Sequence, residues 1–414
     1  MKKFSLKKSM AMVLALAMAL ALCVVPAFAA DTQAYAPVSG TNTSFNKYLV
    51  MDSNANVPNV TFNYTIAPGA AIAAGATFAV SAGNDAAVTG TPTIAADQAA
   101  FSTADVKLDA VAQGDSVTLD AGESYVKKSV TIDFSGVRFS EPGVYRWMIT
   151  EQETAGAMGM AYDTQKGSDA TSMQRVLDVY VIDNDGALEV ASYVIHEKTD
   201  APALGADKGT ADVATALAKV NDKSDGYVNE YSSYDLSFSK AVSGNQASRD
   251  KVFAFTVVIS GAVEGTKYDV DISGAQATSA SNAATIEANA GKTNVTQLTV
   301  GADGSVTQVF YLTHGQSITI KGLAAGTKYS ITENAEDYKP STIWTKGGEP
   351  INGTTASVSE TEGIASDASV AFTNTRNGMV PTGVALSLLP GIALIGVGGG
   401  FAVAASRKKK EDEE

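Results

Sequence analysis

The sequence VLDVYVIDNDGALEVASYVIH, residues 176–196, decides the class of fold. Apolar and polar side chains alternate on both sides of residues 183–186 (DNDG), and Val, Ile and Tyr dominate the flanks. Such alternation is typical of half-buried strands, and Asp-Gly between two strands favours a tight hairpin. The DNDG segment also resembles part of a calcium loop, but it lacks the acidic positions that complete one. The segment therefore predicts two antiparallel strands.

The same strand pattern recurs along most of the chain. It is found in SVTIDFSGVRF (129–139), GVYRWMITE (143–151), KVFAFTVVI (251–259), SVTQVFYL (305–312), QSITIKGL (316–323) and KYSITE (328–333). Long helical patterns are nearly absent, and residues 209–222 give only a weak one. Segments rich in Ala, Gly and Thr at 68–100 and 201–218 are interpreted as long loops or insertions. We therefore predict an all-β chain of antiparallel sandwiches.

Both ends of the chain carry an apolar segment next to basic residues. Residues 1–29 combine a basic start, an apolar run and a small-residue site at Ala27–Ala29, which indicate a secretory signal peptide. Residues 384–406 carry no charge and are long enough to cross the roughly 30 Å bilayer core as one transmembrane helix. Basic residues open the charged tail at 407–414, which predicts a cytoplasmic tail and an external body.

Composition argues against several functions. The formal net charge of −14 repels nucleic acid, so no nucleic-acid partner is expected. Cys23 is the single cysteine and lies in the signal peptide, so the exported chain has no disulfide. His196 and His314 lie far apart in the sequence without cysteine neighbours, which argues against a metal site. The chain also lacks a phosphate loop and a Ser/His/Asp order, so we expect no cofactor and no enzymatic turnover.

A loose internal repeat divides the exported body into residues 30–231 and residues 232–376. Each region opens with a lysine in an alternating stretch, carries a glutamate at the end of a Tyr-containing strand, and closes with an asparagine. The residues concerned are Lys47, Glu151 and Asn229 in the first region and Lys240, Glu333 and Asn374 in the second.

These three residue types can form an amide bond when they are buried together. Burial lowers the pKa of a lysine and raises that of a glutamate, so the pair can exist as neutral amine and neutral acid. The amine can then attack the asparagine carbonyl while the acid moves the proton, and ammonia leaves. The competing interpretation is ordinary surface chemistry, because a lysine on a strand edge usually guards against aggregation.

Both regions resemble isopeptide-containing β-sandwich domains of Gram-positive pilins and cell-wall surface proteins. The first is similar to the streptococcal pilin isopeptide-linkage domain in FNKY (45–48), FSEPGVYRWMITE (139–151) and RVLDVYVIDNDGALEV (175–190). The second is similar to the collagen-adhesin B-type domain, an immunoglobulin-like sandwich, in LSFSKAVSGNQASRDKVFAFTVVI (236–259), GQSITIKGLAAGTKYSITE (315–333) and VAFTNTR (370–376).

The resemblance implies one isopeptide bond in each domain. Lys240 would bond to Asn374 with Glu333 as the acid. Lys47 would bond to Asn229 with Glu151 as the acid, or with Glu153 if the register is shifted. YVNEY (227–231) departs from the usual Phe-x-Asn ending of this family.

Residues 377–383 end in Val380, Pro381, Thr382 and Gly383. Their position between a predicted last strand and a membrane-length segment resembles a sortase cell-wall sorting signal, although the usual Leu-Pro-x-Thr-Gly is missing. The resemblance implies a sortase as partner and cleavage after the threonine. The acyl group would pass to a peptidoglycan precursor or to a lysine of another pilin subunit, for which Lys223 and then Lys219 are the candidates.

Together these features predict a structural surface protein, secreted and then anchored to the cell wall or built into a pilus after a transient membrane stage. A backbone pilin stabilised by self-formed Lys–Asn bonds is the favoured interpretation. The alternative is a monomeric wall-anchored adhesin that binds a host or matrix ligand.

Overall fold

The computed structural model describes residues 35–73, 79–164, 173–197, 223–274 and 289–378. The chain divides into two compact units, Met1–Arg376 and Asn377–Glu414, and every strand lies in the first. The described residues form strands and the connections between them, which confirms the predicted all-β class. Within these ranges no helix is long and apolar enough to cross a bilayer. The predicted signal peptide, transmembrane segment and weak helical pattern at 209–222 lie outside the described residues.

Among the described residues, fourteen strands precede residue 232. They are β1 (Val38–Ser39), β2 (Thr43–Asp52), β3 (Val60–Pro68), β4 (Ser81–Ala82), β5 (Val88–Thr89), β6 (Thr93–Ile94), β7 (Ala99–Phe101), β8 (Glu123–Asp133), β9 (Arg138–Phe139), β10 (Gly143–Gln152), β11 (Met160–Ala161), β12 (Gln174–Asn184), β13 (Ala187–His196) and β14 (Gly226–Tyr231). One sheet has the order β11-β14-β2-β8-β6, and the facing sheet has the order β13-β12-β10-β3-β7, with β4 beside β10. A small sheet β1-β9-β5 completes this part, which we call the first sandwich.

The hairpin predicted from DNDG is confirmed. Strands β12 and β13 pair antiparallel, with Asn184 opposite Ala187. The two turn residues between them, Asp185 and Gly186, have φ values of 53° and 89°. Two left-handed residues in a two-residue loop are what a type I′ hairpin requires, and Asp-Gly adopts them at low cost. The Gly186 N–H also donates to Asp183 Oδ1 at 2.7 Å, which closes the turn.

The described part of the stretch at 68–100, interpreted from sequence as a long loop, contains β4, β5, β6 and the first two residues of β7. Each is two or three residues long, and each pairs with an element other than its neighbour in sequence: β4 with β10, β5 with β9, β6 with β8 and β7 with β3. Small side chains leave little alternation for a sequence pattern to detect. The backbone nevertheless gains hydrogen-bond partners along the edges of longer strands.

In the part of the chain that the structure describes, eleven strands follow and form the second sandwich. They are β15 (Ser233–Ser243), β16 (Phe253–Ser260), β17 (Lys267–Ser273), β18 (Gln297–Thr299), β19 (Ser305–Leu312), β20 (Ser317–Ala324), β21 (Lys328–Glu333), β22 (Lys339–Lys346), β23 (Glu349–Gly353), β24 (Ser357–Glu360) and β25 (Ala368–Thr375). Their sheets have the orders β18-β17-β20-β15-β25-β22-β23 and β19-β16-β21-β24.

Each sandwich has its own hydrophobic core, filled by alternate residues of its strands. Along β16, for example, every second residue is buried, beginning with Phe253 and ending with Ile259. The first core includes Phe45, Phe62, Trp147, Ile149 and Leu177. The second core includes Phe238, Phe255, Phe310, Ile320 and Phe372. Period-two burial over these lengths is the physical basis of the sequence pattern.

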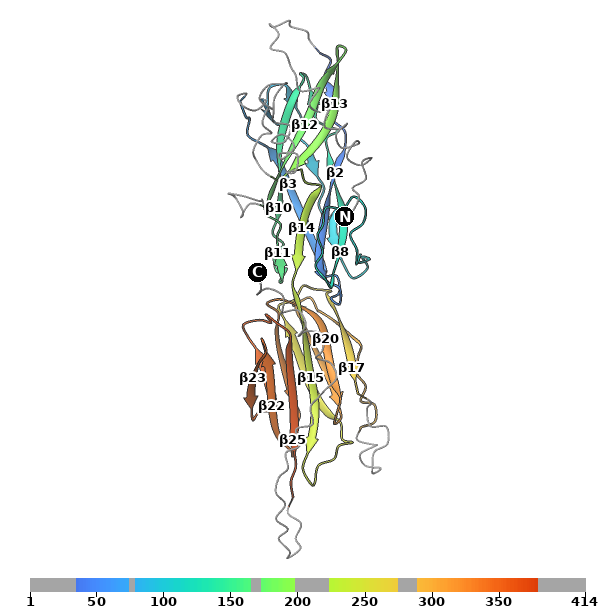
Figure 1. The fold of residues 1–414 in the computed structure, drawn as a ribbon, viewed down its shortest axis with the longest axis vertical. Helices are drawn as coiled ribbons and strands as arrows, with labels where there is room; N and C mark the ends of the chain where they lie inside the picture. The colour runs from blue at the N-terminus through green and yellow to red at the C-terminus, as the bar shows by residue number, and fades with distance from the viewer. Residues whose placement is uncertain (1–34, 74–78, 165–172, 198–222, 275–288, 379–414) are drawn as a thin grey trace, which may run out of the picture. The chain divides into compact units, whose positions relative to one another are not determined.

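In both sandwiches a strand near the start of the region pairs in parallel with the last strand. Figure 1 shows β14 beside β2 and β25 beside β15, and both pairs are parallel. Gly226 opens β14 with φ of 154°, and a Cβ there would lie 1.7 Å from the Asn46 carbonyl oxygen. Only glycine lets the two backbones approach so closely. Parallel pairing therefore brings residues near the two ends of each region side by side.

Candidate functional site: two buried Lys–Glu–Asn clusters

The first cluster contains Lys47 on β2, Glu151 on β10 and Asn229 on β14. All three residues are fully buried. Lys47 Nζ lies 2.7 Å from Glu151 Oε1 and 4.4 Å from the centre of the Phe62 ring. The lysine and the asparagine come from one sheet, while the glutamate comes from the facing sheet. Glu151 therefore reaches Lys47 from the opposite sheet of the sandwich.

The second cluster repeats this plan with Lys240 on β15, Glu333 on β21 and Asn374 on β25. Lys240 Nζ lies 2.5 Å from Glu333 Oε1 and 4.4 Å from the centre of the Phe253 ring. Asn374 Nδ2 donates to the same Glu333 oxygen at 2.8 Å. Here too the lysine and asparagine share one sheet and the glutamate comes from the other.

The two clusters have the same strand register. Lys47 is opposite Tyr227 in the parallel pair, and Asn229 follows two residues later, opposite Leu49. Lys240 is opposite Phe372, and Asn374 again follows two residues later. Residues two apart on a strand point to the same face, so in both sandwiches lysine and asparagine point into the core from neighbouring strands. The predicted internal repeat thus has a geometric counterpart.

Burial changes the proton affinities in both clusters. It lowers the pKa of Lys47 to about 8, although the Glu151 carboxylate opposes that shift. It lowers the pKa of Lys240 to about 8 in the same way, opposed by Glu333. Burial also raises the pKa of Glu333, against the lysine and asparagine that favour its charged form. These opposite shifts bring the neutral amine and the neutral acid closer in free energy to the ion pair.

Several polar atoms of the clusters lack hydrogen-bond partners among the described residues. In the first cluster they include Glu151 Oε2 and Asn229 Nδ2. In the second they include Glu333 Oε2 and Asn374 Oδ1. Unsatisfied buried polar atoms are costly and rare in folded proteins, and they concentrate where chemistry occurs.

Two residues near the first cluster were missed from the sequence. Tyr64 on β3 donates its hydroxyl to Glu151 Oε1 at 2.9 Å. Asp163 donates its backbone N–H to Asn229 Oδ1, also at 2.9 Å. The alternation of the segment VTFNYTI could have indicated that Tyr64 points into the core. No pattern marks Asp163, because it lies in a connection and not on a strand.

The other predicted site residues are either exposed or lie outside the described residues. Glu153, the alternative acid, is exposed, so Glu151 is the glutamate that meets Lys47. Lys223 is exposed three residues before β14, and its backbone pairs with His196 in an isolated bridge. Lys219 and the sorting residues Val380, Pro381, Thr382 and Gly383 lie outside the described residues.

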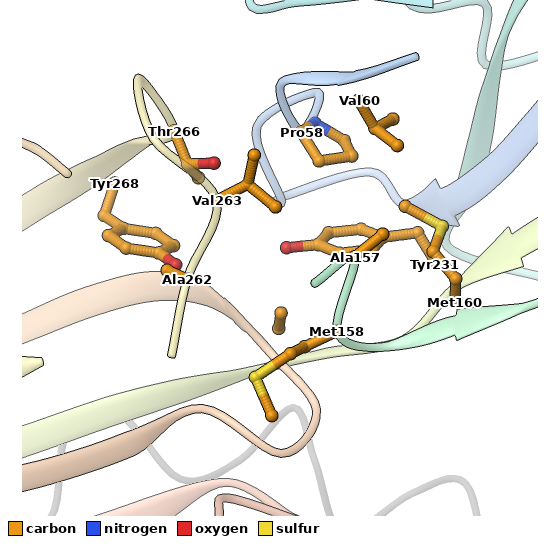
Figure 2. A pocket seen from close by; sticks show the side chains of 11 residues that line it. Pro58, Val60, Ala157, Met158, Met160, Tyr231, Ala262, Val263, Thr266 and Tyr268 are labelled. Atoms are coloured by element: carbon orange, nitrogen blue, oxygen red, sulfur yellow. The ribbon is translucent and has the colours of Figure 1, made fainter. Parts of the chain in front are cut away.

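The described residues offer little room for a ligand at the hollow shown in Figure 2. This hollow has a volume of about 10 Å³ and an apolar lining that includes Pro58, Met158, Tyr231 and Tyr268. A single water molecule needs roughly that much space. In the same parts of the chain, no group of three or more His, Cys, Asp or Glu is arranged to hold a metal ion.

Comparison with known proteins gives relatives for most of the chain. A protein family described as a domain of unknown function (DUF7601) matches residues 234–376. The chain is 28% identical over 283 residues to a pilin of Streptococcus pyogenes serotype M1, covering 66% of this chain and 70% of the relative. Over this span the chain is homologous to that pilin.

Solved structures of pilins are also similar. The crystal structure of the major pilin from Streptococcus pyogenes aligns with a TM-score of 0.47 and 20% identity, covering 82% of this chain and all of that one. The major pilin T3.2 from Streptococcus pyogenes aligns with a TM-score of 0.48 and 17% identity, covering 82% of this chain and 99% of that one.

Proposed function

We propose that this protein is a structural pilin subunit whose two sandwiches are each locked by a Lys–Asn isopeptide bond that the protein forms by itself. The observation that carries the proposal is the pair of buried clusters in matching register, one in each sandwich. Homology to a streptococcal pilin supplies the class of protein. In this proposal Lys47 bonds to Asn229 and Lys240 bonds to Asn374.

The geometry accounts for the roles of the three groups. Glu333 Oε1 lies within hydrogen-bond distance of both Lys240 Nζ and Asn374 Nδ2, so one oxygen can take a proton from the amine and pass one to the leaving nitrogen. Because folding fixes these groups in contact, the reaction gains the acceleration of an intramolecular step. Glu151 has the corresponding place beside Lys47 in the first sandwich.

Each bond would connect strands near the two ends of its region. A pulling force along such a chain would then pass through β2 and β14, or through β15 and β25, without unfolding the loop between them. This suits a subunit that must resist traction in the absence of disulfides, since Cys23 is the single cysteine of the chain.

Assembly on the cell surface forms the second half of the proposal. A sortase would cleave after Thr382 and transfer the chain to a lysine of the next subunit or to a wall precursor. Lys223 is the favoured acceptor because it is exposed beside the start of β14, and Lys219 is the second candidate. The anchored subunit would thus stand outside the cell in a pilus or on the wall.

Two experiments test the proposal. Digestion of the full-length chain followed by mass spectrometry should show two cross-linked peptide pairs, each lighter by one ammonia, about 17 Da. Peptides of unmodified mass at both sites would refute the bonds.

An immunoblot of wall extract boiled in detergent and reductant should show a ladder that disappears in Lys223→Ala and in Thr382→Ala. Lys328→Ala, at an exposed lysine of the second sandwich, is the matched control. A single band at monomer size in the unaltered chain would refute polymerisation.

A further inference from the structure

The two asparagines are presented to their lysines in different ways. In the first cluster the Asp163 backbone N–H donates to Asn229 Oδ1 at 2.9 Å. In the second cluster Asn374 directs its Nδ2 toward Glu333, and its Oδ1 has no hydrogen-bond partner among the described residues. A carbonyl that accepts a bond from a fixed N–H is already polarised, whereas one without a donor is not.

The Asp163 backbone is held in place by its own side chain. Asp163 Oδ2 accepts a hydrogen bond from the Val228 N–H at 2.7 Å, one residue before Asn229. The same oxygen lies 2.6 Å from Arg175 Nη2, and the arginine is 1% exposed. The guanidinium also lies 4.7 Å from the centre of the Tyr227 ring. This Arg175–Asp163 clamp therefore fixes the connection against β14 beside the reacting amide.

We propose that the Arg175–Asp163 clamp positions the Asp163 N–H as the donor that stabilises negative charge on Asn229 Oδ1 during bond formation. This inference rests on the cross-link proposed above. It assigns Asp163 and Arg175 as positioning residues of the first site alone. At the second site no described N–H donates to Asn374 Oδ1.

Bond formation at the first site begins with the Lys47 amine. The lone pair of the neutral Lys47 amine attacks Asn229 Cγ, forming the Nζ–Cγ bond and moving the carbonyl electrons onto Oδ1. The Asp163 N–H stabilises that oxyanion. A proton passes from Nζ through Glu151 to Nδ2, the Cγ–Nδ2 bond breaks, and ammonia leaves as the carbonyl reforms. No oxidant, reductant or cofactor is needed.

The reason to expect a rate effect is preorganisation. A donor that is fixed before the reaction costs no rearrangement when charge develops, and removal of one such donor slows enzymes by about 10²–10³-fold. Asp163→Ala and Arg175→Gln leave the N–H present but unfasten it. We therefore expect bond formation at the first site to slow by about 10- to 100-fold.

The test is a pulse-chase of the full-length chain in cell-free translation, stopped at intervals by acid and analysed for both cross-linked peptides. The Lys240–Asn374 bond of the same molecules is the internal control and should form at its usual rate. Arg175→Lys, which keeps a cation, should restore part of the rate lost in Arg175→Gln. Asp163→Asn should be intermediate, because its side-chain carbonyl can still accept from the Val228 N–H.

A matched control separates positioning from general destabilisation. Arg146 and Asp178 form another buried ion pair in the first sandwich, with Arg146 Nη2 2.7 Å from Asp178 Oδ2. Asp178→Asn should leave the first bond within about twofold of its usual rate, the size of an indirect effect. Equal slowing by Asp178→Asn, or normal rates in Asp163→Ala and Arg175→Gln, would overturn the clamp while leaving the cross-link intact. Absence of both bonds from the unaltered chain would instead overturn the cross-link, and the clamp with it.

Discussion

The substitution Asn374→Ala should show how strongly the second bond stabilises its sandwich. It removes the acceptor carbon, so no bond can form, but it leaves Lys240 in its 2.5 Å ion pair with Glu333. The Asn374 side chain is small and fully buried. The main change is therefore loss of the covalent link between β15 and β25.

The size of the effect follows from the loop that the bond closes. From residue 240 to residue 374 the loop holds about 135 residues, for which the chain-entropy relation for cross-links gives roughly 5 kcal/mol at 25 °C. For a domain of this size each kcal/mol corresponds to about 3–4 °C in melting temperature. We expect the second sandwich of Asn374→Ala to melt about 15–20 °C below that of the unaltered protein.

Scanning calorimetry of the two proteins measures this difference, with mass spectrometry of the same samples to establish which bonds are present. Lys251→Met is a suitable control, because Lys251 lies near the same Phe253 ring as Lys240 and pairs with Glu336 on the partly exposed surface. Loss of such a surface pair should cost at most about 1 kcal/mol. A shift below 5 °C in Asn374→Ala, with the bond present in the parent and absent from the variant, would refute the entropic account of the link.

Two further predictions follow from the same geometry. Burial lowers the pKa of Lys240 to about 8, below its ordinary value of 10.5, and we expect the free lysine of Asn374→Ala to keep this shift. The folded state then binds fewer protons than the unfolded state between these pH values, so stability should rise from pH 8 to pH 10.5. The gain, about 3 kcal/mol, should be absent from the double variant Lys240→Met/Asn374→Ala in urea titrations, and equal slopes for the two proteins would contradict it. Gly226→Ala should destabilise the first sandwich by about 3 kcal/mol or more and prevent the Lys47–Asn229 bond, because its Cβ would meet the Asn46 carbonyl. Gly136→Ala, where a Cβ meets nothing within 4 Å, should change stability by less than about 1 kcal/mol in the same assay.

The strands were predictable because their burial has a period of two. In β16 the residues that alternate in sequence also alternate between core and surface, and the Asp-Gly turn between β12 and β13 has the geometry that its composition favours. The short strands of 68–100 were missed for a physical reason. A two-residue strand has no period, and its existence depends on an edge supplied by a distant strand.

The residues of the two clusters, like the strands, were predictable from the sequence only in part. Lys47 and Lys240 could be selected because a lysine within an apolar alternation must point either into the core or to the surface, and the repeat suggested the core. Asp163 could not be selected, because its effect on Asn229 comes from a backbone N–H, which every residue except proline possesses. Sequence shows which side chains a site contains, but the direction of an amide is set only when the connection folds against its strand.

The two clusters differ in the groups that surround the reacting lysine and asparagine. In the second sandwich Lys240 Nζ and Asn374 Nδ2 both contact Glu333 Oε1, so a single acid serves both reacting groups. In the first sandwich Glu151 Oε1 already accepts from Tyr64, and the Asn229 oxygen has its own donor at Asp163. In the second cluster one acid contacts both reacting groups, whereas in the first cluster Glu151 contacts the lysine and the Asp163 N–H contacts the asparagine. Glu151→Gln should therefore leave slow bond formation at the first site while Glu333→Gln abolishes it at the second, and equal residual rates in the two variants, measured by cross-linked peptide, would show that the clusters work alike.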